Sequence, residues 1–172
     1  MDHFARLGLP AALDLEPASL DRAYFALQRQ WHPDRFVARP AVERAKASAE
    51  AAALNDAYRT LKVPLSRAVY LAELCGVELP GDGKTIDDPE LLMEAMEARE
   101  ELHEAGTIEA IDDLAAKARA DMQASLDGLG GLFLAGDKPA IRKALLRLRY
   151  LDKFAEEARA RRSNLGTNLG KS

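Results

Sequence analysis

A turn-forming stretch in the middle of the 172-residue chain limits what it can fold into. Residues 76–89 read Gly-Val-Glu-Leu-Pro-Gly-Asp-Gly-Lys-Thr-Ile-Asp-Asp-Pro, and their glycines, prolines and aspartates interrupt any helical periodicity. The segments on both sides carry apolar residues at helical spacing, without a convincing strand pattern. The length suits two small domains. We therefore predict an all-α protein with a unit at residues 1–75, a linker at 76–88, a second unit at 89–162 and a flexible tail at 163–172.

The N-terminal half predicts two antiparallel helices and a short third one. Pro17 suits the first turn of a helix, and Pro33 must end it, because the residue before a proline is pushed out of the α region. One face of this helix carries Leu20, Tyr24, Leu27 and Trp31. A second helix is expected from about Ala41 to Leu61, and a third from about Leu65 to Cys75. Two helices joined by a loop of this length are most simply antiparallel.

The C-terminal half predicts a bundle of three helices. The first begins at Pro89 behind an aspartate cap, the second begins at about Thr107, and the third runs from about Pro139 to Arg162. A glycine-rich segment, 128–136, falls at the end of the second helix. Each interior glycine costs about 1 kcal/mol relative to alanine. Either that helix ends near Asp127 or packing preserves it, and both alternatives stay open.

Charge, apolar runs and cysteine content exclude several classes of protein. The formal net charge of −4 argues against a general nucleic-acid binder. No apolar run approaches the roughly 20 residues of a membrane span, and the first residues lack the pattern of a secretory signal. The single Cys75 can form neither an internal disulfide nor a Cys-rich zinc site, so we expect a small buried side chain in a cytoplasmic protein. His3 and His103 lack partners at ligand spacing, and we expect no metal and no cofactor.

The most informative motif is His32-Pro33-Asp34, which falls in the loop between the two antiparallel helices. By itself it is also consistent with a helix stop followed by a turn of the aspartate side chain. Between Arg22 and Lys46 the chain carries six basic side chains and two acidic ones. These cations either steer an acidic partner toward the loop or form an ordinary solvated helix face.

In these residues the chain resembles the J-domain family of co-chaperones, and more narrowly the HscB family of bacterial iron–sulfur cluster assembly. The wider resemblance rests on residues 2–9 (Asp-His-Phe-Ala-Arg-Leu-Gly-Leu), on His32-Pro33-Asp34, and on residues 55–61 (Asn-Asp-Ala-Tyr-Arg-Thr-Leu). The narrower resemblance rests on segments 27–36, 64–71, 92–94, 99–102 and 149–153. These segments reach into a second domain that other J-proteins lack. Arg35 replaces the usual Lys, and the paired Cys-x-x-Cys motifs of some eukaryotic relatives are absent.

The resemblance implies a mechanism without chemistry in this chain. A J-domain would bind a DnaK-type chaperone, similar to HscA, and stimulate its ATPase, so that the chain is an activator and not an enzyme. The residues implied in this contact are His32, Pro33, Asp34, Arg29, Arg44 and Lys46. From the residues themselves, Pro33 holds the loop in one shape and Asp34 can accept a bidentate arginine. The sequence has no G-x-x-x-x-G-K-[ST] loop that would bind ATP.

The same resemblance implies that the C-terminal bundle binds the scaffold protein on which the cluster is built, similar to IscU. The residues implied in this contact are Leu92, Met93, Met96, Glu97, Glu100 and Tyr150. On the sequence alone, the first three either extend the buried helix face or form an exposed patch. Residues 87–104 hold eight carboxylates and one arginine, which predicts an acidic rim. The family more often has Leu at Met96 and Phe at Tyr150, and the added hydroxyl of Tyr150 indicates a hydrated edge of the patch.

Two other functions stay open. One is a J-domain co-chaperone with a different client, and the other is a helical adaptor that is not coupled to a chaperone. A hydrolase built on His32 and Asp34 is the weakest alternative, because no serine of the chain lies in a nucleophile-elbow motif.

Overall fold

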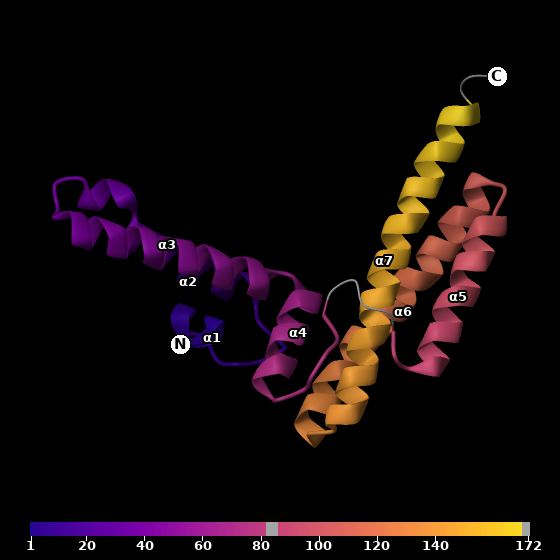
Figure 1. Ribbon diagram of the computed structural model, residues 1–172, viewed down its shortest axis with the longest axis horizontal. Coiled ribbons are helices and arrows are strands. Elements are labelled where there is room, and N and C mark those ends of the chain that lie inside the picture. Colours follow the sequence, from indigo (N-terminus) through magenta and orange to yellow (C-terminus); the bar gives the residue numbers. More distant parts are fainter. Residues whose placement is uncertain (82–85, 170–172) are drawn as a thin grey trace. The chain divides into compact units, whose positions relative to one another are not determined.

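The structure, a computed structural model, describes residues 1–81 and 86–169, and every regular element in these ranges is helical (Figure 1). The predicted all-α class is therefore confirmed. Main-chain contacts divide the chain into two compact units, Met1–Cys75 and Gly76–Ser172. Part of the predicted linker (82–85) and the end of the predicted tail (170–172) lie outside the described residues. None of the helices in the described ranges is both long enough and apolar enough to cross a membrane.

The N-terminal unit consists of four α-helices and one 3-10 helix. Their bounds are α1 (His3–Leu7), α2 (Pro17–Trp31), η1 (Pro33–Phe36), α3 (Ala41–Lys62) and α4 (Pro64–Leu74). The sequence prediction missed α1, since five residues are too few to display a helical period. Asp2 caps this helix by accepting a hydrogen bond of 2.8 Å from the main-chain N–H of Ala5, and Gly8 ends it at φ 66°. Phe4 and Leu7 of α1 are buried.

Helices α2 and α3 form the predicted antiparallel hairpin. Hydrogen bonds join Asp21 to Tyr58, Tyr24 to Asn55, and Gln28 to Ala51. The partners on α3 come earlier in the sequence as those on α2 come later, which is the order of an antiparallel pair. The core of the unit combines large side chains from α1, α2 and α3 with alanines that allow close helix approach; its buried members include Phe4, Leu20, Leu54, Leu61, Ala47 and Ala57.

The C-terminal unit contains the predicted three-helix bundle. Its members are α5 (Pro89–Glu104), α6 (Ile108–Ala135) and α7 (Lys138–Leu169), and both α5 and α6 pack against α7. The side chains of Asp88 and Thr107 cap α5 and α6 by accepting main-chain N–H bonds of 3.1 Å. The buried core contains residues from all three helices, among them Leu91, Leu102, Ile111, Ala118, Leu151 and Phe154.

Helix α6 continues through the glycine-rich segment and ends at Ala135. Gly136 follows at φ 67°, and its main-chain N–H bonds back to the last turn. Leu129 is fully buried inside the segment, so packing preserves the helix there. A Cβ placed at Gly128, Gly130 or Gly131 would meet nothing within 4 Å, so these glycines do not serve a close contact.

Helix α7 continues through Leu169, beyond Arg162, where the sequence predicted its end. Leu165 is partly buried and packs against the core of the bundle. Thr167 also donates a side-chain hydrogen bond of 2.9 Å to the carbonyl of Ser163, one turn earlier. Apolar contact extends the helix beyond the point where glycine and asparagine predicted its end.

Candidate functional site

His32 links the end of α2 to the start of η1. Its extended backbone (φ −60°, ψ 130°) stops α2, and Pro33 with its fixed φ begins η1. The imidazole Nδ1 accepts a hydrogen bond of 3.3 Å from the main-chain N–H of Asp34. The same nitrogen lies 3.5 Å from the carboxylate of Asp34. The side chains of His32 and Asp34 are 56% and 87% exposed, so both are open to a partner.

The residues on either side of the tripeptide hold the loop in place. The rings of Trp31 and Phe36 stack with their centroids 6.0 Å apart and their planes 5° apart. The Arg35 guanidinium donates a 3.2 Å hydrogen bond to the carbonyl of Arg29 in the last turn of α2. Lys46 of α3 lies 5.9 Å from the centroid of the Trp31 ring. The loop is thus ordered before any partner binds, which lowers the entropy cost of binding.

The three basic residues implied in chaperone binding are exposed but lie at different places. Arg29 lies beside His32, and Lys46 approaches the loop through Trp31. Arg44 lies two residues before Lys46 on α3, about half a helical turn away, and no described residue forms an ion pair with it. The structure therefore brings Arg29 and Lys46 to the loop and leaves Arg44 as a separate exposed charge on α3.

A groove beside the tripeptide was missed by sequence reasoning. It has a volume of about 360 Å³ and is lined by Phe25, Gln28, Arg29, His32 and Arg35. The Phe25 side chain is 54% exposed. The signal for it was available, because Phe25 is a large aromatic residue that falls outside the Leu20, Tyr24, Leu27 and Trp31 stripe.

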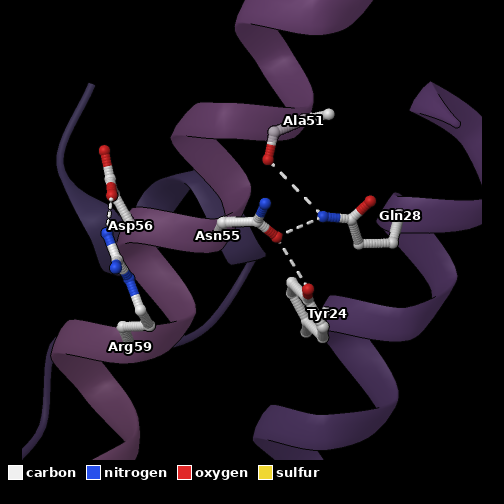
Figure 2. Close-up of polar contacts among 6 residues, drawn as sticks. All are labelled: Tyr24, Gln28, Ala51, Asn55, Asp56 and Arg59. Atoms are coloured by element: carbon white, nitrogen blue, oxygen red, sulfur yellow. Dashed lines mark hydrogen bonds and ion pairs between the residues drawn. The ribbon is translucent and has the colours of Figure 1, made fainter. Parts of the chain in front are cut away.

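A polar network fixes the rotation of α2 against α3 (Figure 2). The Asn55 side-chain oxygen accepts hydrogen bonds of 2.7 Å from the Tyr24 hydroxyl and 2.5 Å from the Gln28 amide. The Gln28 amide also reaches the carbonyl of Ala51 at 3.4 Å. The neighbouring Asp56–Arg59 ion pair, 2.5 Å long, joins two exposed residues of α3 only. The network therefore fixes the orientation of the last turns of α2, which contain Arg29 and end just before His32.

The second candidate site lies on α5. Met93 and Met96 are 63% and 61% exposed, so for these two the exposed-patch alternative is correct. Leu92 is only partly buried. Glu97 and Glu100 are exposed one turn farther along the same helix. Exposed methionine suits a surface that adapts to a partner.

Half of the predicted acidic rim is neutralised within the bundle. Asp87 pairs with Arg142 at 2.5 Å, and Glu90 pairs with Lys143 at 2.5 Å. The hydrogen bond from Arg142 lowers the pKa of the Asp87 carboxyl. Lys143 also lies 3.8 Å from Asp88, and Arg147 lies 2.7 Å from Glu94. Carboxylates without an ion pair among the described residues remain on the C-terminal part of α5, namely Glu97, Glu100, Glu101 and Glu104.

The interpretation of Tyr150 as a hydrated edge residue is wrong. Only 8% of it is exposed, and it packs in the core of the bundle. Its hydroxyl donates to the carboxylate of Glu94, which also accepts a 2.7 Å hydrogen bond from Arg147. Burial and the bond to Glu94 raise the pKa of Tyr150 to about 12. Tyr150 therefore links α7 to α5 from within the bundle core.

Cys75 is exposed, which corrects the expectation of a buried thiol. It follows the last residue of α4 and so lies outside the buried stripe of that helix. His3 stacks on Tyr70 with ring centroids 4.3 Å apart, and His103 is exposed near the end of α5. Within the described ranges, no three His, Cys, Asp or Glu side chains are grouped as metal ligands.

Comparison with known proteins identifies relatives over nearly the whole chain. Residues 87–159 match the family model described as the HSCB C-terminal oligomerisation domain. The co-chaperone protein HscB homolog of Burkholderia multivorans is 39% identical over 168 residues, which cover 96% of each chain. The corresponding homolog of Cupriavidus taiwanensis is 41% identical over 159 residues, covering 91% of this chain and 90% of the relative.

Solved structures agree with these matches. The chaperone HscB from Vibrio cholerae superposes with a TM-score of 0.83 at 33% identity, covering 96% of this chain and 99% of that one. The human co-chaperone protein HscB superposes with a TM-score of 0.85 at 30% identity, covering 93% and 81%. The exposed tripeptide loop, the three-helix bundle and this similarity along both units confirm the resemblance, and the chain belongs to the HscB family of co-chaperones.

Proposed function

We propose that this chain is a cytoplasmic J-domain co-chaperone that binds an IscU-like iron–sulfur scaffold protein and delivers it to an HscA-like chaperone of the DnaK type. It stimulates ATP hydrolysis by that chaperone and so promotes cluster maturation and transfer. The observation that carries the proposal is the ordered and exposed His32-Pro33-Asp34 loop in a member of the HscB family. The chain supplies binding energy and no chemistry of its own.

At the chaperone site, each residue of the loop has a physical role. Pro33 fixes the backbone at the start of η1. The exposed Asp34 carboxylate can accept both N–H groups of a partner arginine. The second ring nitrogen of His32, Nε2, can contact the partner, because Nδ1 already accepts the main-chain N–H of Asp34. Arg29, Arg44 and Lys46 would attract an acidic chaperone surface and raise the association rate.

At the scaffold site, Met93 and Met96 would bury their side chains against an apolar surface, and Glu97 and Glu100 would contact basic residues at its edge. The exposure of all four side chains supports this assignment. Leu92 and Tyr150 would support the contact from below, because one is partly buried and the other is buried. The bound scaffold is then held by the same chain that activates the chaperone, which couples delivery to ATP hydrolysis.

The experiment measures the ATPase rate of a cognate HscA-like chaperone with increasing amounts of this protein, with and without an IscU-like scaffold. The protein alone should hydrolyse no ATP, and the wild type should raise the chaperone rate. His32→Gln should abolish that stimulation while scaffold binding persists, because the loop is exposed and remote from the bundle residues in sequence. Stimulation by His32→Gln equal to wild type would refute the J-domain mechanism.

The scaffold half of the proposal is tested by replacing both exposed methionines, Met93→Ser with Met96→Ser. Truncating residues central to an interface costs about thirtyfold or more in affinity. We expect scaffold binding, measured by calorimetry, to fall by at least this factor while chaperone stimulation without scaffold is unchanged. A folded double variant that binds the scaffold normally would favour a co-chaperone with a different client.

A further inference from the structure

Phe25 is an exposed aromatic residue of α2, seven positions before His32. It falls outside the Leu20, Tyr24, Leu27 and Trp31 stripe, and more than half of it is exposed. It forms one wall of the groove of about 360 Å³ that also contains Arg29, His32 and Arg35. His32 therefore belongs both to the tripeptide loop and to this groove, so the two surfaces are continuous.

The ring is held in place before any partner arrives. Tyr24 lies against Phe25 with ring centroids 5.2 Å apart and planes inclined by 60°, a tilted arrangement that is favourable for aromatic pairs. Tyr24 is itself fixed by its hydrogen bond to Asn55, and Gln28 on the groove wall is fixed by the same carboxamide oxygen (Figure 2). A rigid aromatic side chain costs little entropy on binding.

The charges of the groove indicate its occupant. Arg29 and Arg35 line the groove together with Phe25, and no carboxylate is among the side chains that line it. Such a surface fits an apolar side chain flanked by carboxylates. A second copy of this chain is disfavoured, because a symmetric contact would bring each cationic groove against itself.

We propose that Phe25 is the apolar anchor of the chaperone interface, accepting an apolar side chain that is flanked by carboxylates on the surface of the DnaK-type chaperone. This inference rests on the proposed function and adds a binding determinant to it. Aromatic and arginine side chains in a pocket are the residue types that dominate interface energetics. Phe25 sets how tightly the chaperone binds, whereas the tripeptide delivers the stimulation.

The test is a titration of chaperone ATPase rate against the concentration of full-length protein. Phe25→Ala should raise the half-maximal concentration about thirtyfold and leave the maximal rate unchanged. Phe25→Leu should restore binding to within a few-fold of wild type, since it keeps an apolar side chain. Phe25→Glu should bind at least as weakly as Phe25→Ala, because a carboxylate there repels the acidic partner.

Val42→Ala is the matched control, because Val42 is 81% exposed in the same unit and does not line the groove. It should behave as wild type. If folded Phe25→Ala and Phe25→Glu have the same half-maximal concentration as the wild type, Phe25 is not an anchor of the interface. If instead the wild type itself fails to stimulate the chaperone, the proposed function is refuted and the inference with it. The two results can be told apart, because only the first leaves wild-type stimulation intact.

Discussion

At the scale of single residues, the contact between Tyr150 and Glu94 shows how the core holds the exposed face of α5. One carboxylate oxygen of Glu94 accepts from the Tyr150 hydroxyl and from two nitrogens of Arg147, at 2.7 and 3.1 Å for the latter. Both donors lie on α7 and the acceptor lies on α5. Because Glu94 lies between Met93 and Ala95 in the sequence, fixing it fixes the rotation of α5. That rotation keeps Ala95 buried and Met93 exposed.

The raised pKa of Tyr150 makes a testable prediction about pH. The phenol has a pKa of about 12 in the folded protein, against an ordinary value of 10.0. Between these two values the folded state keeps the proton and the unfolded state loses it. The free energy of unfolding should therefore fall as pH rises through this interval. In Tyr150→Phe the fall should be smaller, as measured by urea unfolding at several pH values.

A second measurement isolates the group directly. The phenolate absorbance of the wild type minus that of Tyr150→Phe, followed against pH, should have its midpoint near 12. A difference curve centred on the ordinary value of 10.0 would show that Glu94 and burial do not perturb Tyr150.

Some of these residue properties could be predicted from the sequence and others could not. Pro33 dictates the end of α2, so an exposed loop at His32 follows from local chemistry alone. Tyr150 is different, because its hydroxyl is satisfied by a carboxylate 56 positions away. Phe25 lies between these cases. Its position outside the apolar stripe can be read from the sequence, whereas the groove beside it can be recognised only in the folded structure.

At the scale of helices, the length of α6 depends on packing that overcomes poor local propensity. Gly128, Gly130 and Gly131 each disfavour a helix, yet α6 passes through all three. The fully buried Leu129 holds this part of the helix in the unit. The sequence correctly predicted where α5, α6 and the two long helices of the N-terminal unit begin. It did not predict the ends of α6 and α7, since those ends depend on tertiary contacts of Leu129 and Leu165.

The glycines of α6 therefore differ in what a side chain would do. Gly131 is exposed, and a Cβ there meets nothing within 4 Å. Gly131→Ala should raise the free energy of unfolding by about 1 kcal/mol through its higher helix propensity. Gly136 has φ 67°, a conformation that residues with a side chain rarely adopt. Gly136→Ala should therefore lower the free energy of unfolding by about 1 kcal/mol. Urea unfolding midpoints of both variants measure the contrast, and equal shifts would contradict this reading of the helix end.

At the scale of the whole molecule, the net charge of −4 averages two different units. Residues 1–75 carry 10 basic and 9 acidic side chains, and residues 76–172 carry 14 and 19. Basic residues around the tripeptide loop and unpaired carboxylates on α5 thus belong to separate units. If the proposed sites are correct, like charges would repel the wrong partner and direct each partner to one unit.

Charge reversals should therefore affect the two partners independently. Arg44 and Glu100 are both exposed and neither forms an ion pair within the described residues, so reversing them breaks no internal contact. Arg44→Glu should raise the half-maximal concentration for chaperone stimulation and leave scaffold affinity unchanged. Glu100→Lys should weaken scaffold binding and leave chaperone stimulation unchanged. Both effects should diminish at high salt, because exposed charges are screened over about 10 Å at 0.1 M.

Two further variants separate local charge from total charge. Arg119→Glu, at an exposed position of α6, changes the net charge by the same amount as Arg44→Glu. Glu156→Lys, at an exposed position of α7, changes it by the same amount as Glu100→Lys. If total charge governed association, each control would match its partner variant. Electrostatic steering acts over about a Debye length, so only charges near a contact alter its rate. The controls should therefore bind both partners as the wild type does, and a control that reproduced the loss would show that neither site is defined by its own charges.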